Sequence, residues 1–149
     1  MADLVDLMPS AKDLRKELAL AESKKASEEM RRRAAAEAEK KSLIDHLTEP
    51  SGVSDEEALR RGAKLVRRAI EAGLTEVQVY RFPNQLCTDH GRAIIQQEQG
   101  WEQTLTGVPK EIYMLWDRHL RPRGYKLKAQ IIDYPNGVPG DIGMTLSWV

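Results

Sequence analysis

Along the first third of the chain, bulky apolar residues lie mainly at the two ends of one long helical pattern, and from Glu22 to Lys41 the only one is Met30. Ser10 is a good N-cap, and the pattern predicts a helix that continues to about Thr48, before a Pro- and Gly-containing stop. Such a helix is about 58 Å long at 1.5 Å per residue. Its middle carries no apolar stripe, and the bulky apolar residues near its ends are Leu14, Leu18, Leu43, Ile44 and Leu47.

The charged middle of this segment favours a solvated helix. Opposite charges recur four residues apart, as in Glu29–Arg33, and such pairs contribute about 0.2–0.5 kcal/mol each. Leu14 and Leu18 begin a heptad pattern, but charged residues take its later seam positions, so a sustained coiled coil is not predicted. We interpret residues 1–49 as a charge-rich helical arm, whether fully ordered or partly disordered. It is either simply solvated or docks a partner through its apolar ends.

The clearest amphipathic pattern lies just after the arm. Ser54 and Glu57 form a capping box, and Gly73 is the expected stop of the helix that follows. Apolar residues at helical spacing predict that Leu59, Val66 and Ile70 are buried against a sheet. The basic residues fall on the opposite helix face and are Arg60, Arg61, Lys64, Arg67 and Arg68.

The second half of the chain alternates between strand and helix patterns. Every aromatic residue lies at or after Tyr80, so the main core is expected in residues 50–149. After the arm, the order α-β-α-α-β-β predicts an α+β two-layer domain whose last two strands pair as an antiparallel hairpin. The expected strands are 76–82, 125–131 and 142–148, and the expected helices between them run from Asn84 or Thr88 to about Gln97 and from Pro109 through His119.

Composition excludes several classes of protein. Lys and Arg number 23 and Asp and Glu number 23, so the net charge is zero and predicts no general attraction to nucleic acid or anionic membranes. A single cysteine excludes an internal disulfide framework and a multi-cysteine zinc site. The sequence contains no apolar run of about 18 residues and no signal-peptide pattern at its start, so we expect a soluble cytoplasmic protein without membrane contact.

Cys87, Asp89 and His90 are the tightest group of reactive side chains. If one helix carries them, Cys87 and His90 are surface neighbours and the imidazole could activate the thiol. The alternative, which we favour, is a buried cysteine beside a capping Thr88 or Asp89, because free cysteines are among the most buried residues. We expect no metal and no cofactor, since neither a zinc-ligand spacing nor a phosphate-binding glycine motif is present. The side chains available for a metal are Cys87, Asp89, His90, His46 and His119.

The basic helix face is the strongest nucleic-acid signal, but it too has a plainer interpretation. Glu56 and Glu57 can pair with Arg60 and Arg61, which is typical of a solvated face. The sequence therefore predicts a small, intracellular, non-enzymatic interaction or regulatory protein. We expect its arm to contact a protein partner or a second copy of the chain. Nucleic-acid binding by the basic face, and an enzyme that uses Cys87 with His90, are the two alternatives.

Overall fold

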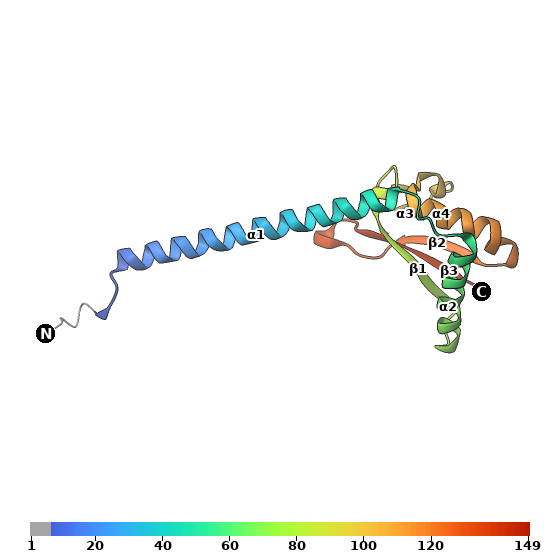
Figure 1. The fold of residues 1–149 in the computed structure, drawn as a ribbon, viewed down its shortest axis with the longest axis horizontal. Helices are drawn as coiled ribbons and strands as arrows, with labels where there is room; N and C mark the ends of the chain where they lie inside the picture. Colours follow the sequence, from blue (N-terminus) through green and yellow to red (C-terminus); the bar gives the residue numbers. More distant parts are fainter. Residues whose placement is uncertain (1–6) are drawn as a thin grey trace. The chain divides into compact units, whose positions relative to one another are not determined.

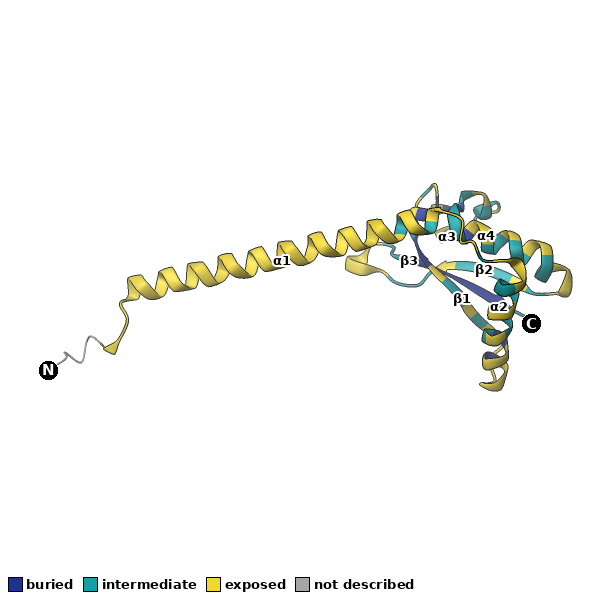
Figure 2. Cartoon of the chain, viewed as in Figure 1, coloured by how far each residue is buried: buried dark blue, intermediate teal, exposed yellow. Residues whose placement is uncertain are grey.

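The computed structural model describes residues 7–149, which form two compact units divided between Ser42 and Leu43. The first unit holds most of helix α1, Ala11–Thr48. Ser10 caps it as predicted, because the Ser10 hydroxyl accepts a hydrogen bond of 3.1 Å from the Asp13 amide. No residue within Ala11–Thr48 is buried, and α1 is exposed along most of its length in Figure 2. The predicted long helix is confirmed.

The second unit, Leu43–Val149, is built on a three-stranded antiparallel sheet. Strand β3, Asp141–Ser147, lies between β1, Glu76–Pro83, and β2, Lys126–Ile131 (Figure 1). The predicted β2–β3 hairpin is confirmed. Alternation along β3 places Ile142, Met144 and Leu146 on the packed face. On the opposite face, long polar side chains such as Lys128 and Glu76 pair across the sheet at 2.9 Å.

Helices cover the packed face of the sheet and complete the predicted α+β fold. Helix α2 packs on β1, and α3 packs on β2. Side chains from β1, from β3 and from the segment between β1 and the last helix form the core. Its buried residues are Phe82, Leu86, Cys87, Ile94, Leu105, Ile142 and Met144. The helices are α2 at Asp55–Glu71, α3 at Arg92–Ile95 and α4 at Gly107–Leu115, which continues as a π-helical turn at Trp116–Leu120 and a 3-10 turn at Arg121–Arg123.

The helix expected to run from Asn84 or Thr88 to about Gln97 was predicted wrongly. The structure has a 3-10 turn at the start of this region and only the short α3 near its end. His90 and Gly91 adopt positive φ angles of 56° and 86°, and Gln97 adopts 53°. Left-handed residues cannot continue a right-handed helix, so α3 begins and ends between these positions.

The last turn of α1 belongs to the second unit. Ile44 and Leu47 are half-buried and pack against the core. Gly107, at the start of α4, has a φ of +62°, and a Cβ there would collide with the Leu47 carbonyl oxygen. Both its φ and this close approach therefore require glycine. The domain begins at Leu43, and residues 43–49, which the sequence places in the arm, contribute to it.

A shortened chain tests this boundary. A chain that begins at Leu43 is expected to keep the stability of the domain, whereas one that begins at Ser51 is expected to lose about 2–3 kcal/mol. The loss reflects the partial burial of two aliphatic side chains, Ile44 and Leu47. Urea unfolding with linear extrapolation measures it. Equal stability of the two chains would show that the end of α1 adds nothing to the core.

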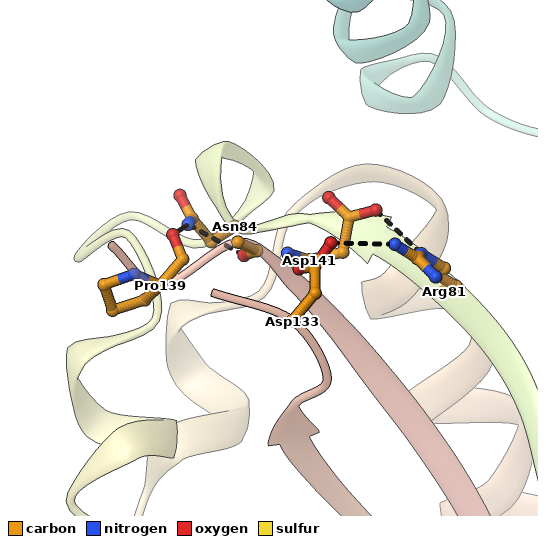
Figure 3. A network of polar contacts seen from close by, with 6 residues as sticks. Arg81, Asn84, Asp133, Pro139 and Asp141 are labelled. Carbon is orange, nitrogen blue, oxygen red and sulfur yellow. Dashed lines mark hydrogen bonds and ion pairs between the residues drawn. The ribbon is translucent and has the colours of Figure 1, made fainter. Parts of the chain in front are cut away.

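A polar network holds the connection between β2 and β3 to the end of β1 (Figure 3). Arg81 donates hydrogen bonds to Asp141 at 2.8 Å and Asp133 at 3.0 Å. The bond to Asp141 is the main cause that raises the Arg81 pKa above its ordinary range. The Asn84 amide donates to the Pro139 carbonyl at 2.9 Å. These groups satisfy one another, so we assign the network a structural role.

Candidate functional site

A cleft of about 1030 Å³ lies between α2, α4 and the packed face of the sheet. All of its walls belong to the second unit. The cleft exists because α2 packs on β1 and leaves a gap between itself and α4. The apolar lining includes Leu59 and Val66 from α2, Val79 and Leu127 from the sheet, and Ile112 and Leu115 from α4.

The apolar face of α2 is only partly covered. Within Asp55–Glu71, only Val66 and Ala69 are buried. Leu59 is half-buried, and Ile70 is 55% exposed. The expectation that Ile70 is buried is therefore wrong, since its side chain lines the cleft instead of packing on the strands. Part of the apolar surface that the sequence pattern assigns to the core is therefore exposed in the structure.

Gly62 lies in the middle of α2 and also lines the cleft. Apart from its chain neighbours and the backbone of its own helix, no atom of the described chain lies within 4 Å of the position that a Cβ on Gly62 would occupy. Neither packing nor a positive φ therefore calls for glycine here, although glycine in a helix interior is less favourable than alanine by about 0.8–1.0 kcal/mol. What glycine does at this position is keep the α2 wall of the cleft open.

An ion-pair cluster stands where α2 begins, at one side of the cleft. The Asp55 carboxylate lies 3.0 Å from the Arg118 guanidinium and 3.0 Å from His119 Nε2. The hydrogen bond from His119 is the main cause that lowers the Asp55 pKa, and the charge of Arg118 adds to it. His119, on the apolar stripe of the last helix, is hydrogen-bonded to Asp55 and only half-buried, so it is not a core residue.

The remaining charged groups of the lining are predominantly cationic. Glu111 accepts a 2.7 Å hydrogen bond from the Ser51 hydroxyl, and Arg61 pairs with Glu57 at 3.2 Å. Arg67 and Arg123 line the cleft and make no ion pair with any described residue. Four arginines and two carboxylates line the cleft in the described part of the chain, so its charge is net positive.

Three aromatic side chains also line the cleft: Tyr80, Trp116 and Tyr125. Trp116 is fixed by a 3.0 Å hydrogen bond from its indole Nε1 to the Tyr125 carbonyl oxygen. Burial raises the pKa of Tyr80, and the charge of Glu111 raises it further. Trp116 is therefore a rigid indole in contact with the cleft volume, which makes it a natural fluorescence reporter.

The predicted reactive group does not assemble into a catalytic arrangement. Cys87 is 1% exposed and is bridged in extended conformation to Leu105. Burial raises its pKa to about 11; the charge of Asp89 adds to the rise, and a hydrogen bond with Thr104 opposes it. The thiolate is the nucleophilic form of cysteine, so this environment suppresses nucleophilic chemistry near neutral pH.

His90 and Asp89 have other places in the fold. His90 is exposed, and its left-handed conformation keeps it off any helix that Cys87 could share, so the helical pairing of the two is wrong. The Asp89 carboxylate accepts hydrogen bonds from the Gly91 and Ala93 amides at 3.0 and 2.9 Å. Burial acts to raise the Asp89 pKa, but these bonds outweigh it and the net shift is downward. Asp89 thus shapes the start of α3.

The basic residues of α2 are exposed, and two of them, Arg61 and Arg67, also line the cleft. Arg60 pairs with Glu56 at 2.5 Å, and Arg61 pairs with Glu57, so both predicted pairs are present. The other three basic residues of this face make no ion pair with a described residue. All five of the predicted residues are exposed: Arg60, Arg61, Lys64, Arg67 and Arg68.

The apolar residues predicted to contact a partner separate into two groups. Leu14 and Leu18 lie in the first unit and are 46% and 60% exposed. Leu43 is 47% exposed, whereas Ile44 and Leu47 pack on the domain's own core. The N-terminal end of α1 is therefore freely available for a contact, and the C-terminal end is largely used within the domain.

Residues 7–149 contain no group of three or more His, Cys, Asp or Glu side chains placed to hold a metal ion. None of the helices described is both long and apolar enough to cross a membrane. The chain has no significant match among protein-family models, curated proteins or solved structures.

Proposed function

We propose that this chain is a non-enzymatic interaction protein that contacts a protein partner, or a second copy of itself, through the N-terminal part of α1. One observation carries the proposal: none of the residues in Ala11–Thr48 is buried. Helices without tertiary packing are marginal in water, and most helices in proteins owe their stability to a packed face. Contact with another surface would supply the packing that α1 lacks.

Leu14 and Leu18 are the residues that we assign to this contact. They are four positions apart and therefore lie on one face of the helix. Ala11 and Ala21 extend that face by one turn in each direction, and Lys25 ends it. The contact surface is therefore a short apolar strip, narrow enough to leave α1 solvated when no partner is present.

The basic face of α2 supports a second candidate, a nucleic-acid contact. Lys64, Arg67 and Arg68 are exposed and have no ion-pair partner among the described residues. A phosphate-contacting surface gives binding that weakens steeply as salt is raised. If the chain binds DNA or RNA at low salt, and changing Arg60, Lys64 and Arg67 together to Gln abolishes that binding, this second function is the correct one.

The arm contact is tested with two matched double variants. Leu14→Gln with Leu18→Gln removes the strip, and Leu20→Gln with Met30→Gln removes two apolar residues that are each 71% exposed elsewhere on α1. Sedimentation over a range of concentrations reports self-association, and capture on immobilised protein reports a partner. We expect the first variant alone to lose the association, with thermal unfolding unchanged in both.

The proposal fails if the parent chain neither self-associates nor retains a protein. It also fails if the two variants behave identically in both measurements.

A further inference from the structure

The geometry points to the α2–α4 cleft as a binding site for a small apolar molecule that carries one anionic group, with a long-chain carboxylate as its simplest form. This function is separate from the proposed contact by α1, since every lining residue lies in the domain. Pockets for small molecules typically have volumes of about 300–1,000 Å³. At about 1030 Å³, the cleft lies at the upper end of this range and has room for such a ligand.

The apolar part of the ligand is inferred from the surfaces that the fold leaves uncovered. Leu59 is half-buried, and Ile70 and Met114 are 55% and 47% exposed, yet all three line the cleft. Leu59 and Ile70 line the cleft from α2, and Met114 lines it from α4. Leu127 and Leu146 of the sheet line the same cleft. A hydrocarbon chain in this position would cover apolar surface that the protein itself does not cover.

The anionic group is inferred from the charges of the lining. The two carboxylates are already engaged, Asp55 with Arg118 and Glu111 with Ser51. Arg67 and Arg123 line the cleft without an ion-pair partner among the described residues. A guanidinium binds a carboxylate through charge-assisted hydrogen bonds, so these two arginines select an anion over a cation or a neutral alcohol.

Gly62 adds an independent reason and also provides the test. Gly62 lines the cleft, and beyond its own helix nothing described lies within 4 Å of its Cβ site, so a larger side chain at this position has space to extend into the cleft. Leucine is a better helix former than glycine, so Gly62→Leu should fold at least as well as the parent chain while its side chain narrows the cleft at the α2 wall. Loss of binding in this variant cannot then be attributed to unfolding.

The experiment measures binding of dodecanoate, dodecanol and dodecyltrimethylammonium to the full chain by calorimetry, with intrinsic tryptophan fluorescence, to which Trp116 in the cleft contributes, as a second readout. We expect saturable binding of dodecanoate, weakened about tenfold or more by Gly62→Leu and by Arg67→Gln with Arg123→Gln. Lys64→Leu places the same side chain on the outer face of α2 and should leave the affinity within about twofold of the parent value. Circular dichroism confirms that all variants are folded.

Three results would overturn the inference. They are an absence of saturable dodecanoate binding, equal affinity for dodecanol or for the cationic amphiphile, and unchanged affinity in Gly62→Leu.

Discussion

Replacing Phe82 with alanine is expected to destabilise the domain by about 3–5 kcal/mol. Phe82 is 1% exposed, lies opposite Ile142 on β3 and stacks on Tyr80 with ring centroids 6.0 Å apart. Removing the ring loses its transfer free energy and leaves a cavity that the rigid sheet cannot close. Because small domains have total stabilities of about 5–15 kcal/mol, the midpoint of urea unfolding should fall markedly.

Tyr134→Ala is the matched control for this prediction. Tyr134 is also aromatic but is 59% exposed. Its replacement should change the free energy of unfolding by about 0.5 kcal/mol or less, as is usual for surface positions. If both substitutions cost the same, the core would not be centred on β1 and β3 as described.

Val66→Asp is the second substitution for which a large effect is expected, about 3–5 kcal/mol. Val66 is 9% exposed and is one of two buried residues of α2. Aspartate at this position loses the burial of the valine and brings a charge into apolar surroundings. Ile70→Asp, one turn further along the same apolar face, should cost about 1 kcal/mol or less, because Ile70 is largely exposed.

Thermal and urea unfolding of this pair check how α2 faces the sheet. A tolerated Val66→Asp would mean that α2 turns a different side toward β1. A severe effect of Ile70→Asp would mean that the cleft is closed in solution. The two variants thus examine the fold and the open cleft separately.

Local sequence patterns were sufficient for most of the fold. The side chain of Ser54 accepts a hydrogen bond from the Glu57 amide at 3.2 Å, as the capping box predicts. Alternation identified β2 and β3, since a strand with one packed face repeats every two residues. These elements share one property: the information that specifies them lies within a few residues along the chain.

The features that the sequence did not reveal depend on distant residues. The local pattern from Asn84 to Gln97 does not predict that His90 adopts a positive φ, which is uncommon for a residue other than glycine. Ile44 resembles the other apolar residues of the arm, and its contact with the core depends on where α1 ends in space. The prediction that Cys87 is buried was correct. It did not depend on distant residues, because free cysteines in general tend to be buried.

The cleft is the least predictable feature, because empty volume depends on how far apart two helices stand. Hydrophobic spacing indicated which face of α2 is apolar, and it could not say how much of that face the sheet would cover. One local signal did exist. Gly62 interrupts the apolar face of an otherwise strong amphipathic helix, and no turn or positive φ explains it.

The strand order β1-β3-β2 also has a consequence for how the protein is made. As the chain leaves the ribosome, β1 and β2 appear before β3, yet neither pairs with the other. Both strands pair only with β3, so the sheet that holds Phe82 and Leu127 cannot form until β3 is free to insert between them. Partly synthesised chains with exposed strand edges are prone to aggregate.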